Sequence, residues 1–286
     1  MIEFEKDLMA NPTDLVVVVG DVTSTLACTI VAKKLNTKVA HVEGGIRSFD
    51  MTMPEEVNRL VTDSISDYFF TTSEVANTNL LKAGVSPTQI FFVGNTMIDT
   101  LQSNIHKAIK PELWDSANLQ SRNYYVLTLH RPSNVDDIDK FSRLMTTLDD
   151  LTGTSVVFPV HPRTRKNLEL IGNKIKNIIP IEPLSYLEFI YLLKEAGGVI
   201  TDSGGVQEET TVLQVPCITL RNNTERPETV TIGTNELIGE DIGGLKKAIQ
   251  QINNGQWKTG EIPPLWDGQT AGRIVKIISE LNLKST

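Results

Sequence analysis

The chain has 286 residues, and its 27 Lys and Arg against 35 Asp and Glu give a formal net charge of -8. A pI of about 5.1 argues against a general nucleic-acid binder and against binding to anionic membranes. No apolar run is long enough to span a membrane and no signal peptide opens the chain, so we expect two globular domains in the cytoplasm. Cys28 and Cys217 lie far apart without metal-binding spacing, which favours reduced thiols and no metal.

The first part of the chain alternates short apolar runs with helical segments. Residues 1–12 read as the end of an amphipathic helix, and residues 14–20 form a β-branched run typical of a parallel strand buried on both faces. Further strands are expected at residues 38–42, 68–71 and 90–94, with helices at 26–35, 54–64, 74–83 and 96–109. This alternation predicts an α/β domain with a doubly wound parallel sheet.

A second series of strands and helices follows a polar link near residues 111–118. Strands are expected at residues 124–130, 155–160, 178–181, 198–201 and 216–220, and helices at 136–151, 168–175, 185–195, 242–251 and 272–281. A further helix is expected to open with residues 206–209. The predicted domains are residues 1–115 and 116–265, and residues 266–286 are expected to form a helix that crosses back to the first domain. Chemically useful residues follow strand ends in both domains, which is where open α/β sheets bind ligands.

A glycine turn at residues 202–205 is the first candidate site. It joins the strand at 198–201 to a helix whose expected N-cap is Ser203. Gly204 and Gly205 allow close approach to the backbone, and the unpaired N–H groups of a helix N-terminus suit a phosphate. Glu209 lies far enough into the helix to reach a sugar hydroxyl beside that phosphate. The alternative is an ordinary turn that binds nothing.

Three carboxylates of the first domain form a second candidate group. Asp21, Glu43 and Glu55 follow successive strands and are expected to face one site, where crowding would suit them to proton transfer. The alternative reading makes Asp21 and Glu55 helix caps and Glu43 the partner in a loop salt bridge.

Basic and aromatic residues complete the set in the second domain. His130 and Arg131 follow the strand at 124–130, where an imidazole and a guanidinium could serve a phosphate group. Arg226 could contact a diphosphate or simply pair with a glutamate. His161 follows the next strand, and Phe189 could stack on a flat ring or belong to the core. The sequence contains no Walker A motif, no G-x-G-x-x-G after a strand and no H-E-x-x-H.

Several motifs together resemble one family. The segments VVVVGDVTSTLA, HVEGGIRSFD, MPEEVNR, TLHRPSNVD, TDSGGVQEE and RNNTERPETVTIGT are similar to those of the non-hydrolysing UDP-N-acetylglucosamine 2-epimerases. The resemblance implies the GT-B architecture, with two Rossmann-like domains and an active site in the cleft between them. It also implies interconversion of UDP-GlcNAc and UDP-ManNAc, through elimination of UDP and its re-addition, in the synthesis of cell-surface polysaccharide or glycan precursors.

The resemblance further assigns roles by motif. Asp21, Glu43 and Glu55 match the catalytic acids, and His130 matches the histidine near the diphosphate. The matched substrate-binding residues are Arg131, Leu184, Phe189, Ser203, Gly204, Gly205, Glu209 and Arg226, with Leu184 and Phe189 at the uracil and Glu209 at the ribose. His161 lies where some bacterial members bind a second UDP-GlcNAc, within a different motif. No cofactor and no metal are implied, and a homodimer is expected.

The resemblance departs from the family at the N-terminus. Members begin with a strand, a Gly-Thr-Arg-Pro-Glu loop and further βα units that are not found before residues 16–19. The first domain is therefore expected to be incomplete, with residues 15–20 as an exposed edge strand. An incomplete gene, a separate polypeptide or a surviving remnant would each explain this. The alternatives to the epimerase are a hydrolase or glycosyltransferase of the same fold, or a catalytically impaired UDP-binding fragment.

Overall fold

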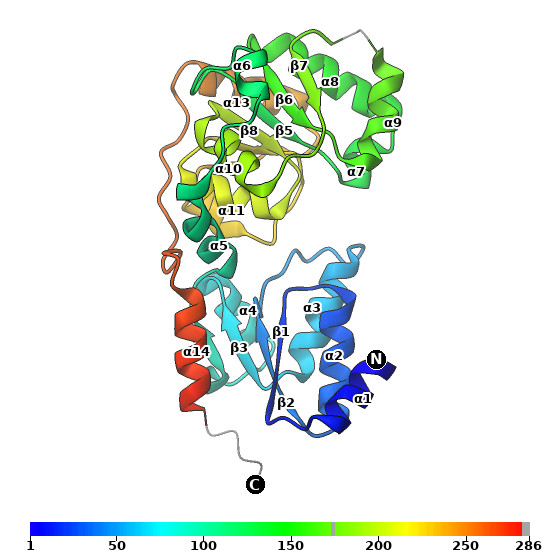
Figure 1. Ribbon diagram of the computed structural model, residues 1–286, viewed down its shortest axis with the longest axis vertical. Helices are drawn as coiled ribbons and strands as arrows, with labels where there is room; N and C mark the ends of the chain where they lie inside the picture. The colour runs from blue at the N-terminus through cyan, green and yellow to red at the C-terminus, as the bar shows by residue number, and fades with distance from the viewer. Residues whose placement is uncertain (173–174, 282–286) are drawn as a thin grey trace. The chain divides into compact units, whose positions relative to one another are not determined.

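A computed structural model describes residues 1–172 and 175–281 (Figure 1). Its contacts divide the chain into unit 1, Met1–Asp99 with Pro264–Thr286, and unit 2, Thr100–Pro263. The expected boundary near residue 115 lies later than this division. Residues 100–115 group with unit 2 because Ile109 N donates to Leu187 O, and Trp114 packs edge-on against Tyr124 and Tyr191. Residues 282–286 of the expected C-terminal helix, and 173–174 of the helix expected at 168–175, lie outside the described residues.

Unit 1 is built on a four-stranded parallel sheet in the order β1-β2-β3-β4. Its strands are β1 (Leu15–Val19), β2 (Lys38–Val42), β3 (Tyr68–Thr71) and β4 (Ile90–Phe92). Its helices are α1 (Ile2–Ala10), α2 (Thr23–Lys34), α3 (Pro54–Ile65), α4 (Glu74–Lys82), η1 (Pro87–Gln89) and α14 (Thr270–Glu280), and α5 (Thr96–Asn104) runs across the division of the chain.

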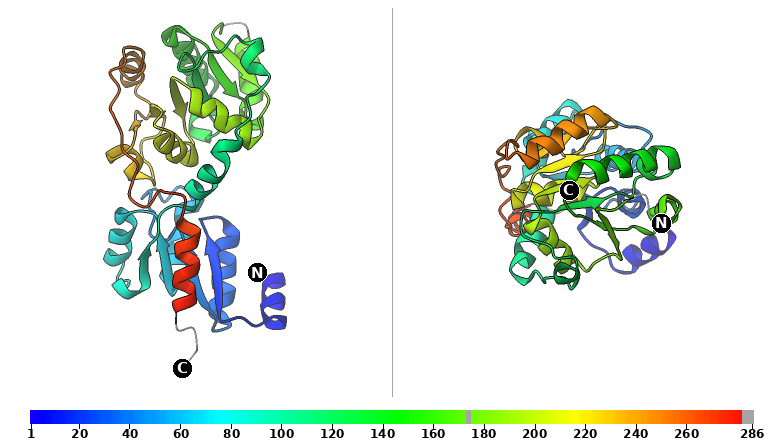
Figure 2. Two further views of the ribbon diagram at one scale, coloured as in Figure 1. Left: turned by 60° about the vertical axis from the view of Figure 1, so that its left-hand side comes forward. Right: turned by 90° about the horizontal axis from the view of Figure 1, so that it is seen from above.

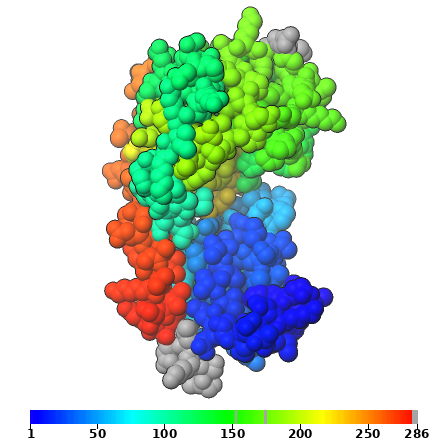
Figure 3. Space-filling model, in the orientation of Figure 1, coloured from blue at the N-terminus to red at the C-terminus, as the bar shows by residue number. Residues whose placement is uncertain are grey.

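Strand β1 lies at the edge of this sheet, as the sequence predicts. One face of β1 is covered, because Val16 and Val18 pack with α1 and α2 in a small core. The other face is open at Val17 and Val19, which are 45% and 53% exposed. The N-terminal residues that include α1 form part of the outer surface of unit 1, in blue in Figure 3.

The last described helix packs on the opposite face of the same sheet. Ile274 of α14 joins Ala40 and Phe70 in a second core, and Figure 2 shows α14 in red beside the strands of unit 1. The segment before α14 is anchored by Trp266, which is fully buried and donates from its indole N–H to Thr72 O at 3.0 Å. Burying the indole with its donor satisfied fixes this C-terminal segment to unit 1.

Unit 2 contains a six-stranded parallel sheet in the order β10-β9-β8-β5-β6-β7. Its strands are β5 (Tyr125–Thr128), β6 (Val156–Pro159), β7 (Ile178–Ile181), β8 (Gly198–Thr201), β9 (Cys217–Thr219) and β10 (Asn235–Leu237). Numbered by appearance, this is the doubly wound order 3-2-1-4-5-6, whose strand order reverses between β5 and β8.

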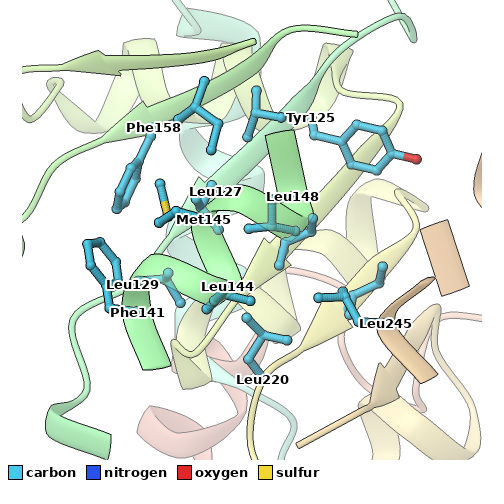
Figure 4. Packing of buried hydrophobic residues seen from close by; sticks show 14 of the residues in the cluster. Tyr125, Leu127, Leu129, Phe141, Leu144, Met145, Leu148, Phe158, Leu220 and Leu245 are labelled. Atoms are coloured by element: carbon cyan, nitrogen blue, oxygen red, sulfur yellow. The ribbon is translucent and has the colours of Figure 1, made fainter. Parts of the chain in front are cut away.

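Helices cover both faces of the second sheet. They are η2 (Ile105–Lys107), α6 (Leu113–Ser116), α7 (Pro132–Val135), α8 (Ile138–Thr152), α9 (Pro162–Ile171), α10 (Tyr186–Glu195), α11 (Gly204–Leu213), α12 (Pro227–Thr231) and α13 (Ile242–Asn253). On one face Phe141, Met145 and Leu148 of α8 pack against Leu127 and Phe158 of the sheet (Figure 4). A second core, which includes Val126 and Leu192, fills the other face. The central strands are buried on both sides, as their continuous apolar sequences predict.

The structure also corrects some element boundaries. Helix α9 begins at Pro162 rather than near residue 168, because Pro at the first helical position needs no hydrogen-bonded N–H and His161 caps the helix. Strand β10 was not predicted, since Asn235–Leu237 carries no β-branched run. In the described part of the chain no helix is long and apolar enough to cross a membrane.

Candidate functional site

The glycine turn of unit 2 connects β8 to the N-terminus of α11. The N-cap of α11 is Ser203, as expected, but its side chain makes no capping hydrogen bond. The backbone N–H of Ser203 donates instead to Thr201 Oγ1 at 2.9 Å. Gly204 and Gly205 open the helix and are only partly buried. The first turn of α11 is therefore not capped by its own serine, which suits an external anion at this helix end.

This turn lies at the point where the strand order of the sheet reverses. Strands β5 and β8 are neighbours in the centre of the sheet, and β5 is followed by His130 and Arg131 as β8 is followed by Asp202 (Figure 1). Ligands of open α/β sheets bind beyond the carboxyl ends of the strands at such a switch point. The topology brings together the two segments of unit 2 that the sequence singled out.

Asp202 joins these two segments, a role that the sequence did not reveal. It is fully buried and accepts hydrogen bonds from Arg131 N at 2.9 Å and from Asn134 Nδ2 at 3.1 Å, and its Oδ1 lies 2.9 Å from His130 Nδ1. Burial by itself raises the pKa of Asp202, but these hydrogen bonds and the charge of His130 hold it below its usual value. The ionised carboxylate therefore orients His130 through Nδ1 and leaves Nε2 for another partner. Arg131 Nε donates to Asp202 O at 3.1 Å.

Glu209 lies on α11 and is paired with a tyrosine that was not predicted as a site residue. Only 4% of Glu209 is exposed, and Tyr186 Oη donates to its Oε1 at 3.0 Å. Burial raises the pKa of Glu209 to about 7, although the Tyr186 hydrogen bond opposes this rise. Tyr186 is the first residue of α10, whose start is fixed by a capping box of Ser185 with Glu188. The Ser185 and Glu188 capping box is the sequence pattern that could have predicted the start of α10, and with it the position of Tyr186.

Phe189 and Leu184, the expected pair for a flat ring, lie on and just before α10. Both are partly buried and pack against the core that contains Leu192 and Val199. Phe189 therefore does belong to the edge of the hydrophobic core, which was the alternative to stacking on a ring. The partial exposure of both side chains leaves apolar surface that a ring could cover.

Arg226 lies in a buried group of charges beside the glycine turn. Its Nε forms an ion pair with Glu208, so the glutamate pairing considered for it is present. Next to it Arg221 pairs with Glu225 at 2.6 Å. Burial alone raises the pKa of Glu225, but the charges of Arg226 and Arg221 lower it to about 2. A Cβ placed on Gly204 would lie 2.9 Å from Glu225 Oε1, so the ionised carboxylate packs directly against the turn.

In unit 1, Asp21 follows β1 and is held by α3. Its carboxylate forms an ion pair with Arg59, which is 4% exposed, and its backbone carbonyl accepts from Asn58 Nδ2 at 2.8 Å. The N-cap of α2 is Val22, so Asp21 does not cap that helix. The ion pair with a guanidinium fixes the position of this partly buried carboxylate.

Glu43 and Glu55 differ in their surroundings. Glu43 follows β2 with a φ of 70°, a left-handed conformation that costs a non-glycine residue on the order of 1 kcal/mol and is typical of functional sites. Glu55 is exposed in the first turn of α3, whose N-cap is Met53. Its neighbour Glu56 is buried and accepts from the backbone N–H of Ser48 at 2.8 Å. The loop before α3 is thus fixed by Glu56, and Glu55 remains accessible.

The second histidine motif has a structural role in this chain. His161 Nδ1 accepts from Arg163 N at 3.2 Å as the cap of α9, and Arg163 pairs with Asp136 at 2.8 Å. The rings of His161 and His130 have centroids 5.9 Å apart. Among residues 1–172 and 175–281 no group of three or more His, Cys, Asp or Glu is placed to hold a metal ion.

Comparisons with known proteins identify the family of this chain. A model of the UDP-N-acetylglucosamine 2-epimerase family matches residues 1–279. UDP-N-acetylglucosamine 2-epimerase of Methanocaldococcus jannaschii is 43% identical over an alignment of 293 positions, which covers 98% of this chain and 79% of that protein. The protein of the same name from Methanococcus maripaludis is 41% identical over 97% of this chain and 78% of its own length.

Solved structures give the same result. The crystal structure of the Methanocaldococcus jannaschii UDP-GlcNAc 2-epimerase, in complex with UDP-GlcNAc and UDP, has a TM-score of 0.84 and covers 98% of this chain and 79% of that one. A putative UDP-N-acetylglucosamine 2-epimerase from Listeria monocytogenes, 30% identical, has a TM-score of 0.86 and covers 99% and 78%. The chain therefore belongs to the UDP-N-acetylglucosamine 2-epimerase family.

Proposed function

We propose that this protein interconverts UDP-N-acetylglucosamine and UDP-N-acetylmannosamine by inverting C2 of the sugar. The observation that carries the proposal is the switch point of unit 2, where an anion-suited helix N-terminus and the His130–Asp202 pair follow adjacent strands. This arrangement suits the diphosphate of a nucleotide sugar, and the family relationship supports the reaction. The reaction supplies an N-acetylmannosamine donor for glycan or polysaccharide precursors.

The chemistry requires loss of a weakly acidic proton together with a good leaving group. A carboxylate takes the proton from C2, the C2–H electron pair forms the C1–C2 double bond, and the C1–O bond breaks with its electrons going to UDP. A carboxylic acid on the opposite face then delivers a solvent-derived proton to C2, where the electrons of the C1–C2 double bond form the new C–H bond, and attack of the UDP oxygen on C1 gives the epimer. Neither step consumes water or a redox cofactor.

The residues of this chain divide between these tasks. Asp21, Glu43 and Glu55 of unit 1 supply the carboxylates that exchange the proton and contact the sugar. In unit 2 the N–H groups of Gly204 and Gly205, with Arg131, Arg226 and the Nε2 side of His130, stabilise the charge that develops on the departing diphosphate. Glu209 accepts from the ribose hydroxyls, and Phe189 with Leu184 covers the uracil ring. We further propose that the enzyme acts in the cytoplasm as a homodimer, where its free cysteines Cys28 and Cys217 stay reduced.

Product analysis tests this function. The purified protein is incubated with UDP-GlcNAc, and the products are separated and identified by NMR. We expect a mixture of UDP-GlcNAc and UDP-ManNAc that is the same when the reaction starts from either sugar nucleotide. Release of UDP with free N-acetylmannosamine would indicate a hydrolase, and UDP binding without any turnover would indicate a binding protein; either result would contradict the proposal.

A further inference from the structure

A network of buried titratable side chains lies beside the turns that carry Asp21 and Glu43 in unit 1, which we call the two acidic turns. His41 of β2 is fully buried, and the side chains of Asp63 on α3 and of Arg47 are 4% and 6% exposed. Neither proton transfer nor diphosphate binding, as described above, uses any of these three groups. Charged groups are rarely buried to this extent unless they are paired, and here all three are.

Asp63 connects the other two side chains. Its Oδ1 lies 2.6 Å from His41 Nδ1, and its Oδ2 lies 2.6 Å from Arg47 Nη2. Burial alone raises the pKa of Asp63, but the hydrogen bonds and charges of His41 and Arg47 more than offset this and hold the pKa below its usual value. The carboxylate is therefore ionised and can only accept hydrogen bonds. His41 Nε2 lies 2.8 Å from Gly20 O, so the buried ring bridges Asp63 and the backbone carbonyl of Gly20.

These bonds attach the network to the backbone of both acidic turns. Gly20, whose carbonyl accepts from His41, directly precedes Asp21. Gly45, whose N–H donates to Asp63 Oδ2 at 3.0 Å, lies two residues after Glu43. Both turns depend on left-handed backbone, with φ of 68° at Gly20 and 70° at Glu43. One ionic network therefore holds two turns that are far apart in the sequence.

Stability alone does not account for such a network. Buried ion pairs contribute little to stability relative to apolar side chains of similar volume, because both charges lose their hydration. A fixed position is what such a network does provide, and left-handed turns persist only when the surrounding contacts determine them.

We propose that His41, Asp63 and Arg47 are positioning residues, which set the Asp21 and Glu43 turns for proton transfer without touching the substrate. The proposal rests on the proposed function, in which Asp21 and Glu43 act on the sugar. The network fixes the backbone positions from which the side chains of Asp21 and Glu43 extend. Loss of its central charge loosens both turns at once, while the glycine turn of unit 2 and its hold on UDP are unaffected.

The test compares Asp63→Asn with Asp67→Asn. Asp67 is a matched control because it also accepts from a backbone N–H, that of Val39 at 2.7 Å, and pairs with a cation, Lys33 at 2.7 Å, but at the opposite end of β2. For Asp63→Asn we expect kcat to fall about 10- to 100-fold, the scale of a misplaced catalytic group, with the UDP Kd changed less than about twofold. For Asp67→Asn we expect an unchanged kcat. Both variants are assayed well below their unfolding temperatures.

A second readout follows the turns directly, through the backbone amide NMR signals of protein labelled with [15N]glycine. Asp63→Asn should shift Gly20, Gly44 and Gly45 and leave Gly204 and Gly205 unchanged, whereas Asp67→Asn should leave all five unchanged. A folded Asp63→Asn variant with wild-type kcat, or one in which the three unit 1 signals do not move, would overturn the proposal. Absence of turnover in the unaltered protein would instead contradict the proposed function, and the glycine signals would still decide the positioning role.

Discussion

The two sheets of this protein present different chemistry beyond the carboxyl ends of their strands. Beyond the sheet of unit 2 lie a helix N-terminus not capped by its serine, a histidine oriented by Asp202 and small residues that allow close approach of an anion. Beyond the sheet of unit 1 lie carboxylates on left-handed turns, held by paired charges on α3. The first arrangement suits a diphosphate, and the second suits proton transfer. This contrast predicts that substitutions in unit 1 change turnover and that substitutions in unit 2 change UDP binding.

The largest expected effect is on turnover, from Asp21→Asn. Replacing this carboxyl group with an amide should lower kcat about 1,000-fold, within the range for loss of a general acid or base. The UDP Kd, measured by calorimetry, should stay within about threefold of the wild-type value because unit 2 is unaltered. Circular dichroism serves as the control, since Arg59 loses one of its two carboxylate partners in this variant and keeps only Glu56. An equal loss of UDP binding would contradict the inference that unit 1 acts in turnover while unit 2 binds UDP.

A pH-dependent change in stability is expected from Glu209→Gln. The pKa of Glu209 in the folded protein is about 7, above its ordinary value of 4.5, so the folded state binds an extra proton between these pH values and loses stability as the pH rises through them. Glutamine does not ionise. Above pH 7 the variant should recover up to about 3 kcal/mol of the free energy of unfolding, since its amide oxygen can still accept from Tyr186, and near pH 4.5 it should recover none.

Urea unfolding of both proteins at pH 4.5 and pH 8 measures this difference. The same variant should bind UDP more weakly, because an amide replaces the carboxylate that accepts from the ribose. An equal difference in stability at the two pH values would show that Glu209 is not a buried acid of raised pKa.

A smaller effect on binding is expected from Gly204→Ala. The added Cβ would lie 2.9 Å from Glu225 Oε1, which Arg221 holds in place, so either this ion pair or the start of α11 must shift. Overpacking of this kind costs about 1–3 kcal/mol, and we expect the UDP Kd to rise about tenfold. Gly272→Ala is the control, since nothing lies within 4 Å of its added Cβ in helix α14. It should leave the Kd unchanged and raise the unfolding temperature slightly. Equal UDP Kd values for the two variants would show that the glycine turn is not part of the UDP-binding site.

The smallest effect is expected from Tyr186→Phe. Loss of the hydroxyl removes a hydrogen bond that lowers the pKa of Glu209, so this pKa should rise above about 7. UDP affinity at pH 7 should fall about three- to tenfold, as expected for one hydrogen bond, and should recover at pH 8.5, where the carboxyl is ionised again. A loss of affinity that is the same at both pH values would show that Tyr186 acts by packing alone.

Much of the fold follows from local sequence, and less of the site does. Continuous β-branched runs such as residues 14–20 predict parallel strands, and the Gly-Gly turn predicts Ser203 as the N-cap of α11. The prediction that residues 14–20 are buried on both faces is wrong, because β1 is an edge strand whose Val17 and Val19 are exposed. The sequence does not predict strand β10, because its three residues carry no apolar pattern. The boundary near residue 115 was placed at a polar stretch, although residues 100–115 pack on the core of unit 2.

The residues that the sequence did not reveal act through partners distant in the chain. Asp202 contacts His130 and Arg131 across 72 and 71 positions, and Asp63 contacts His41 across 22. Tyr186 reaches Glu209 across 23 positions. No local pattern marks such pairs, because their members meet only when the strands pair and the helices pack. Sequence motifs therefore predict the residues proposed to contact the ligand. The residues that hold those side chains in place can be identified only from the folded structure.

The most direct test of the central claim is the fate of the C2 proton in deuterated water. If the protein removes that proton with loss of UDP and a solvent-derived proton is delivered to the opposite face, UDP-ManNAc formed from UDP-GlcNAc in D2O should carry deuterium at C2 and at no other carbon. Proton NMR of the purified product measures this. UDP-ManNAc that forms with its C2 hydrogen retained would contradict the account.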